Sequence, residues 1–172
     1  IRDVERSRGL GDVYKRQPFI RVADLSKFGL SEPAIYLNKL EFKDTIRPQK
    51  DTILLSKDGS VGIAYKVEEP IDVITSGAII HLNITDKDVL PDYLTLVLNS
   101  FVVKLQAERD AGGSIIQHWK PSEIEDVIIP ILPPSEQVTI SKMLQQSFTL
   151  RKESKRLLQE AIQIVETAIE EN

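Results

Sequence analysis

The sequence predicts a mixed α/β (α+β) domain followed by one long C-terminal helix of the coiled-coil type. Short apolar runs separated by turn residues fill residues 19–84, and an amphipathic helical pattern follows at 90–108. Residues 135–172 contain neither proline nor glycine. We therefore divide the chain into a non-native or disordered leader at 1–17, a globular domain at 18–134 and a long helix at 135–172.

The leader, "IRDVERSRGLGDVYKRQ", has no hydrophobic periodicity. Its end, "DVYKRQ", can be encoded by GAT GTG TAT AAG AGA CAG, which is similar to a transposon end used in preparing sequencing libraries. We interpret the leader as a translated adapter with no role in the fold. The alternative is a natural disordered arm.

Strands are expected where apolar residues alternate with polar ones or form short β-branched runs. These segments are 19–25, 51–56, 61–67, 71–75, 78–84 and 124–132, the last ended by Pro133 and Pro134. The helix expected at 90–108 starts at Pro91-Asp92 and ends at the double glycine 112–113.

The stretch "LLSKDGSVGIAYKV" (54–67) resembles a phosphate-binding loop only superficially. Such a loop needs lysine and serine or threonine after its second glycine, at the start of a helix. Here Gly62 precedes Ile63-Ala64-Tyr65, which favours a strand. The sequence therefore predicts a hairpin with Asp58-Gly59 in its turn.

No residue pattern predicts catalysis, a bound metal or a cofactor. The chain lacks cysteine, and His81 and His118 stand apart from any carboxylate pattern that would complete a metal site. The acidic group "EIEDV" (123–127) reads as a solvated surface. No apolar run is long enough to span a membrane, and we expect a cytoplasmic protein.

The charge is unevenly distributed around a net value of −4. Residues 18–66 carry 8 basic and 6 acidic side chains, whereas residues 67–134 carry 4 basic and 11 acidic ones. A basic surface can form only in the first half of the domain. Tight solitary binding to a phosphate backbone is therefore not expected, because that affinity grows with the number of phosphates neutralised.

The C-terminal helix carries a heptad seam in which Met143, Ser147, Leu150, Ser154, Leu157, Ala161, Ile164 and Ala168 are spaced alternately by four and three residues. Leu158, Ile162, Val165 and Ile169 flank the seam and widen the apolar face. A helix of this length reaches about 50 Å, too long for a small domain to cover. We expect it to pair with another helix.

The ordered segments "FIRVADLS", "ILLSKDGSVGIAYKV", "ITSGAIIHLNI", "LPDYLTLVLNS" and "GGSIIQHWKPSEIEDVIIPILPPSEQVTISKML" resemble the target-recognition domain of type I restriction–modification specificity subunits. The resemblance runs from about Phe19 to the end. It implies that the domain reads one half of a split DNA target. It also implies that the helix is a spacer, pairing antiparallel with a second such helix in the same or another chain.

The resemblance further implies a non-catalytic subunit around which methyltransferase (modification) subunits and restriction subunits assemble on double-stranded DNA. S-adenosylmethionine and ATP are then expected only in those partners. The family usually carries two recognition domains and two spacer helices, whereas this sequence has one of each. We interpret it as a truncated C-terminal half, with a half-length subunit that dimerises as the alternative.

Candidate DNA-contacting residues lie in the turns and in one irregular stretch. Side chains suited to base edges are Lys57, Asp58 and Ser60, Ser76, and Ser114, Gln117 and His118; Lys39, Lys43, Arg47 and Lys50 suit phosphates. Each of these is also an ordinary choice for a solvated turn.

Three other functions are compatible with the residues. The chain would be the recognition end of a fused adenine methyltransferase if a methylase motif preceded it. It would be a coiled-coil adaptor if no basic face surrounds the 57–60 and 114–118 turns. It would be an enzyme if His118, Asp58 and Asp110 met in one pocket.

Overall fold

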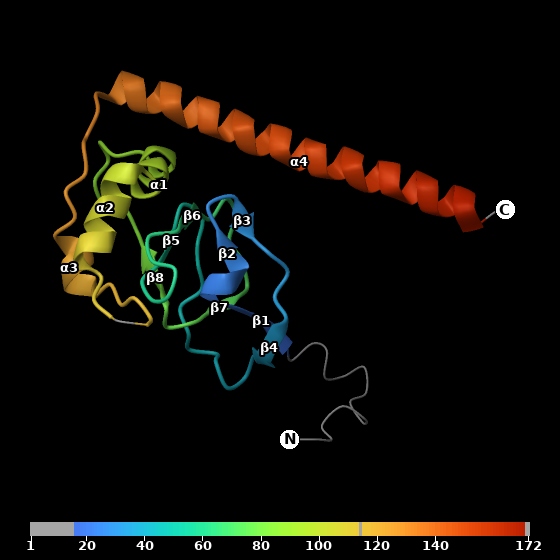
Figure 1. Ribbon diagram of the computed structural model, residues 1–172, viewed down its shortest axis with the longest axis horizontal. Coiled ribbons are helices and arrows are strands. Elements are labelled where there is room, and N and C mark those ends of the chain that lie inside the picture. The colour runs from blue at the N-terminus through green and yellow to red at the C-terminus, as the bar shows by residue number, and fades with distance from the viewer. Residues whose placement is uncertain (1–15, 114, 171–172) are drawn as a thin grey trace.

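The computed structural model describes residues 16–113 and 115–170, which form a globular head and one long helix (Figure 1). In chain order the head contains β1 (Arg16–Ile20), a 3-10 turn (Val22–Asp24), β2 (Leu25–Ser26), β3 (Gly29–Leu30), β4 (Ile35–Asn38), β5 (Ile53–Ser56), β6 (Ala64–Lys66), β7 (Ile74–Thr75), β8 (Ile79–Leu82), α1 (Pro91–Leu98), α2 (Phe101–Asp110) and α3 (Pro121–Glu125). Helix α4 (Pro134–Glu170) follows. The predicted combination of a mixed α/β domain and a long C-terminal helix is confirmed.

Three small sheets build the head. Their strand orders are β4-β1-β7, β2-β3 and β6-β5-β8, and every pairing is antiparallel except β1 with β7. Strand β5 is buried on both faces, because Ile53 and Leu55 pack toward the helices while Leu54 packs against Ile20 and Val67. This two-sided burial explains why the strand is a continuous apolar run in the sequence.

The start of the head differs from the expected strand at 19–25. Strand β1 begins at Arg16, inside the range assigned to the leader, and Gln17 is buried within it. The strand ends at Ile20 because Asp24 accepts hydrogen bonds from the Arg21 backbone N–H and side chain, which curls the chain into the 3-10 turn.

The expected single helix at 90–108 is two helices, since Asn99 interrupts it. The Asn99 side chain donates to the Ala64 carbonyl at 2.7 Å and accepts from the Ala64 N–H at 3.2 Å, so it bonds to strand β6. A new helix starts immediately afterwards, at Phe101. Within the described residues α1 and α2 thereby cover different parts of the same core.

The strand expected at 124–132 is wrong. The segment contains the end of α3 and then an extended connection to α4. The Gln106 side chain accepts from the Ile128 N–H and donates to the Ile128 carbonyl, so it takes the place of a neighbouring strand. Pro130 lacks an N–H, and its carbonyl accepts from the Tyr93 hydroxyl at 2.7 Å.

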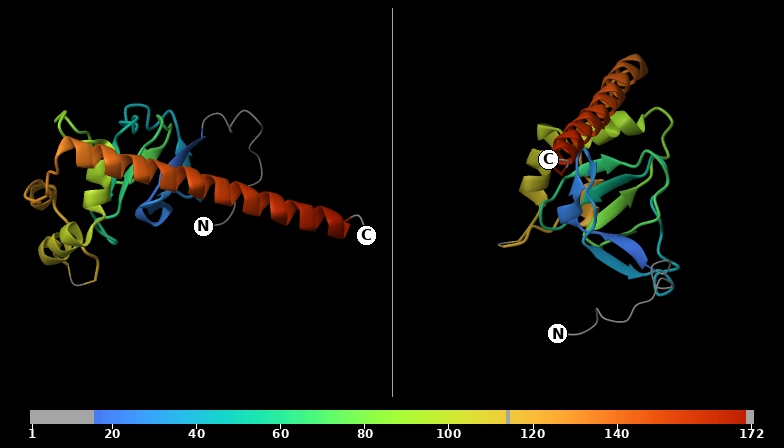
Figure 2. Two further views of the ribbon diagram at one scale, coloured as in Figure 1. Left: turned by 90° about the horizontal axis from the view of Figure 1, so that it is seen from above. Right: turned by 90° about the vertical axis from the view of Figure 1, so that its right-hand side faces the viewer.

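Helix α4 passes over α1 and then continues past the head (Figures 1 and 2). It begins one residue before the expected Ser135 and runs unbroken through the last described residue. Every side chain from position 149 to 170 is exposed. No helix in the described part of the chain has a stretch apolar and long enough to cross a membrane.

Candidate nucleic-acid interface and helix junction

The 57–60 turn is shaped by two glycines and one buried serine. Gly59 and Gly62 have φ values of 76° and 81°, in the left-handed region that glycine favours. The Ser56 hydroxyl accepts from the Ile63 N–H at 2.9 Å and donates to the Ser60 carbonyl at 2.6 Å. The turn is thus rigidly held at the end of the β5–β6 pair, as the hairpin prediction requires.

A second segment, 117–119, is bound to this turn. The Gly59 N–H donates to the Gln117 carbonyl at 2.9 Å, and the Trp119 N–H donates to the Lys57 carbonyl at 2.7 Å. Trp119 is fully buried in the core and anchors the segment. We call Lys57, Asp58, Ser60, Gln117 and His118 the turn cluster. Residues 60 positions apart in sequence therefore share one surface.

Asp58 is the centre of the turn cluster. Its carboxylate contacts the Lys57 Nζ at 2.7 Å and the His118 Nδ1 at 2.9 Å. Burial raises the pKa of Asp58, but hydrogen bonds from Lys57 and His118 outweigh burial and lower the pKa below its ordinary value. The lysine charge is therefore compensated locally, and the cluster is not the basic patch that phosphate binding alone would need.

The remaining candidate residues are not all part of the turn cluster. The Ser76 N–H donates to the Ile20 carbonyl, and nearby Ala78 accepts from the Lys57 N–H, so the 76–78 turn adjoins the turn cluster. Ser114 lies outside the described residues. Asp110 forms its ion pair with Arg109 at 2.6 Å, rather than completing a triad with His118 and Asp58. Among the described residues no group of three His, Asp or Glu side chains is arranged to hold a metal ion.

The expected phosphate contacts fall into two kinds. Lys39 pairs with the exposed Asp72 at 2.6 Å, and Lys43 is exposed. Arg47 is instead largely buried and donates to the Gln17 side chain and to the carbonyls of residues 42 and 45. Hydrogen bonds from Lys39 lower the pKa of Asp72 despite some burial. Arg47 therefore supports the loop more than it offers charge to a ligand.

The junction between head and helix is a feature that the sequence analysis missed. Gln137 is fully buried and makes three hydrogen bonds: it accepts from the Leu90 N–H and donates to the carbonyls of Asp88 and Leu132. It belongs to the quoted "PPSEQ" segment, and a glutamine at the start of an apolar helix stripe was the available signal. These bonds fix where the helix leaves the head.

A buried ion pair reinforces the junction. The Lys66 Nζ lies 2.8 Å from the Asp92 carboxylate at the start of α1, and Gln145 of α4 donates to the same carboxylate at 2.6 Å. Burial lowers the pKa of Lys66, but Asp92 and Glu68 raise it above its ordinary value overall. Farther along, the Arg151 guanidinium stacks on the Phe28 ring at 4.0 Å.

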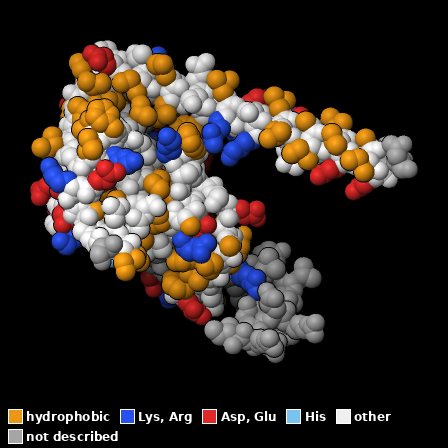
Figure 3. All heavy atoms as spheres, in the orientation of Figure 1, with side chains coloured by type: hydrophobic (Ala, Val, Ile, Leu, Met, Phe, Trp, Pro, Cys, Tyr) orange, Lys and Arg blue, Asp and Glu red, His pale blue; other side chains and the backbone are white. Residues whose placement is uncertain are grey.

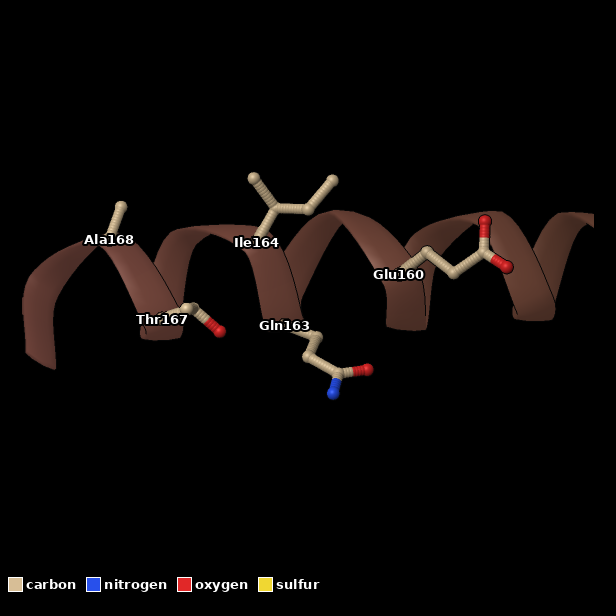
Figure 4. Close-up of a pocket in the computed structure, with 5 residues that line it drawn as sticks. All are labelled: Glu160, Gln163, Ile164, Thr167 and Ala168. Carbon is tan, nitrogen blue, oxygen red and sulfur yellow. The ribbon is translucent and has the colours of Figure 1, made fainter. Parts of the chain in front are cut away.

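The predicted pairing residues of α4 lie on an exposed surface. Exposed fractions are 68% for Met143, 62% for Leu150, 51% for Leu157 and 70% for Ile164. Leu158, Ile162, Val165 and Ile169 are also exposed. Figure 3 shows hydrophobic side chains along the part of the helix that stands clear of the head. Figure 4 shows Ile164 and Ala168 on one side of the helix, with Gln163 and Thr167 on another.

Comparisons with known proteins agree with this architecture. Residues 8–163 match the family model described as the type I restriction modification DNA specificity domain. The S subunit of a type I restriction–modification system from M. genitalium matches with a TM-score of 0.58 and 20% identity, over 84% of this chain and 34% of that one.

A structure described as the basis of complex assembly and conformational transition of the type I R-M system matches with a TM-score of 0.55 and 17% identity, over 89% of this chain and 37% of that one. The chain thus spans about one third of each solved chain. No curated protein matches it. Since the family model covers most of the sequence, the chain belongs to the type I restriction–modification DNA specificity family.

Proposed function

We propose that the head reads one half of a bipartite DNA target and that helix α4 sets its distance from a second reader. The observation that carries this proposal is the family match over residues 8–163, which includes both the head and most of the helix. Methyltransferase and restriction subunits assemble on the paired module and supply the chemistry. The specificity domain is not itself catalytic, and it requires no cofactor.

The distribution of charge on the head favours recognition of DNA bases through hydrogen bonds over binding through attraction to phosphates. The turn cluster balances Lys57 against Asp58, while His118, with a side chain 61% exposed, and Ser60 present polar groups to solvent. Hydrogen bonds to base edges carry sequence information, whereas phosphate contacts supply affinity and orientation. Phosphate contacts by the partner subunits then provide most of the affinity, and the isolated chain binds DNA weakly and in a salt-sensitive way.

The test is to map DNA methylation directed by the assembled complex. Gln117→Ala together with His118→Ala removes two candidate contacts, and Gln159→Ala together with Gln163→Ala on the exposed helix is the matched control. We expect the double variant in the head to relax or change the half-site, at about 1–3 kcal/mol of discrimination for each lost base contact. The control is expected to methylate the original sites.

Exchanging residues 19–120 for the same region of another family member extends the test to the whole head. A changed half-site with an unchanged spacing supports the reader role. Unaltered sites after the exchange, or loss of methylation at every sequence while the complex stays assembled, would contradict it.

A further inference from the structure

The His118 side chain extends from a backbone position that is held on both sides. The His118 N–H donates to the Gly112 carbonyl at 2.7 Å, and His118 pairs with Asp58 across an isolated antiparallel bridge. The next residue, Trp119, is fully buried in the core. The side chain itself is exposed. A fixed backbone therefore presents an imidazole that a ligand can reach.

The two nitrogens of this ring have different surroundings. The His118 Nδ1 lies 2.9 Å from the Asp58 Oδ1. The Nε2 makes no hydrogen bond to another residue in the described ranges 16–113 and 115–170. Nε2 is thus the ring atom that remains available to a ligand.

Asp58 determines which nitrogen carries the proton. The pKa of Asp58 lies below its ordinary value, so at neutral pH its carboxylate is ionised and can only accept hydrogen bonds. Nδ1 must therefore donate, and in the neutral imidazole the lone pair is left on Nε2. An acceptor at Nε2 suits the exocyclic amino group of adenine or cytosine, whereas guanine and thymine present carbonyl oxygens in the major groove.

Lys57 makes this tautomer depend on the chemical identity of residue 58. The Lys57 Nζ donates to the other carboxylate oxygen of Asp58, Oδ2, at 2.7 Å. An ammonium group has no acceptor, so it requires an oxygen opposite it. An asparagine at position 58 would keep its oxygen toward Lys57 and turn its amide NH₂ toward His118. Nδ1 would then accept, and the ring proton would lie on Nε2.

We propose that Asp58 is a positioning residue that makes the His118 Nε2 a hydrogen-bond acceptor, and that His118 thereby selects an amino base, adenine or cytosine, at one position of the half-site. This inference rests on the proposed reader function and adds the class of base that one side chain reads. Reversing the tautomer should reverse the choice, so Asp58→Asn should select a keto base, guanine or thymine, at the same position.

The tautomer is measured by ¹⁵N NMR of the imidazoles in the full-length chain, at the pH of the methylation reaction. The chain has two histidines, so the spectrum of His118→Ala assigns the signals. We expect the proton on Nδ1 in the wild type and on Nε2 in Asp58→Asn. His81, whose Nε2 bonds to the Thr75 hydroxyl, should not change. Unchanged emission from Trp119, the single tryptophan, shows that the 117–119 segment keeps its place.

The base is measured by mapping the DNA methylation that the assembled complex directs. We expect Asp58→Asn to exchange an amino base for a keto base at one position, with about a tenfold preference, the ratio that one hydrogen bond supplies. His118→Ala should lose the preference there. Asp58→Asn combined with His118→Ala should match His118→Ala, because Asp58 acts through the ring. Asp44→Asn, which removes the same charge from an exposed position, should keep the original half-site.

The remaining outcomes overturn the proposal. These are a wild-type ring with a proton on Nε2, the same tautomer in Asp58→Asn, an unchanged base after the tautomer has reversed, and a double variant that differs from His118→Ala. The exchange of residues 19–120 tests the reader role separately. If that exchange changes the half-site and Asp58→Asn does not, the proposed function stands and this inference alone fails. If the exchange leaves the sites unaltered, both fail.

Discussion

Helix α4 passes through two environments. Between Pro134 and Phe148 it is held against the head by polar side chains, of which the buried Gln137 makes three hydrogen bonds and the exposed Gln145 makes one. From residue 149 to residue 170 every side chain is exposed, although large apolar residues continue at regular spacing. The first half is stabilised by contacts within this chain, and we propose that the second half binds a partner.

The proposed spacer function assigns a different task to each half. A spacer helix must be fixed to the head at one end and to its partner at the other, and the buried hydrogen bonds of Gln137 fix it to the head. In this proposal the exposed seam fixes the other end by binding the second helix. Changes in the first half are therefore expected to affect folding and helix direction, whereas changes beyond Arg151 are expected to affect association alone.

The largest expected effect is loss of association when charge enters the exposed seam. In a pair of α4 helices, Leu157→Glu together with Ile164→Glu places four glutamates in the interface. Burying these unpaired charges has a large free-energy cost, so the helices should no longer pair. We expect a monomer by sedimentation with an unchanged urea midpoint for the head. Gln159→Glu together with Gln163→Glu adds the same charge off the seam and is expected to leave association unchanged.

The next effect concerns Gln137 and should appear as lost stability. Gln137→Ala leaves the Leu90 N–H and the carbonyls of Asp88 and Leu132 without their partner, and we expect a cost of about 2–4 kcal/mol. Urea unfolding of the full chain measures it. Gln163→Ala, on the exposed half of the same helix, is the control and should change stability by less than about 0.5 kcal/mol. If both variants lowered the free energy of unfolding equally, the two halves of the helix would not differ in their contribution to stability.

The sequence was informative about the helix and about strand β5 because both have strong local signals. The 4-3 spacing of apolar residues predicted an unbroken helix, and the continuous run Ile53-Leu54-Leu55 predicted a strand, which the structure buries on both faces. The turn at Asp58-Gly59 followed from residue preferences within four positions. Each of these patterns is set by neighbours in the chain.

The predictions of a strand at 124–132 and of a single helix at 90–108 failed because a distant side chain took the place of a backbone hydrogen-bond partner. The Gln106 side chain bonds to Ile128 in place of a strand, and Asn99 bonds to Ala64 and divides the expected helix. The local sequence around a glutamine or an asparagine does not indicate which distant backbone group its side chain will bond to. For the same reason, the contact of Asp58 with His118, and the local compensation of Lys57, could not be predicted from spacing.

A smaller effect is expected at the boundary between the two halves, where Arg151 stacks on Phe28. Phe28→Ala removes the ring from the β2–β3 turn, and a cation–π contact of this exposure is worth about 0.5–1 kcal/mol. We expect a broader distribution of distances between spin labels on the head and near the helix end. Arg156→Ala is the control, because Arg156 pairs with Glu153 and Glu160 of its own helix. An unchanged distribution in Phe28→Ala would show that the junction at Gln137 fixes the direction alone.

The smallest effect is a pH dependence confined to the head. A backbone hydrogen bond from Arg21 is the main reason that the pKa of Asp24 lies below its ordinary value of 3.8. Because the folded pKa is the lower one, this contribution to stability is complete above about pH 3.8 and declines as the pH falls through the folded value. Asp24→Asn should therefore reduce the acid-induced loss of stability in urea titrations, whereas Asp44→Asn in an exposed loop should leave it unchanged. Since neither carboxylate lies on α4, we expect association through the seam to respond equally to acid in both variants. A change in association in Asp24→Asn would instead mean that the head and the exposed half of the helix are coupled.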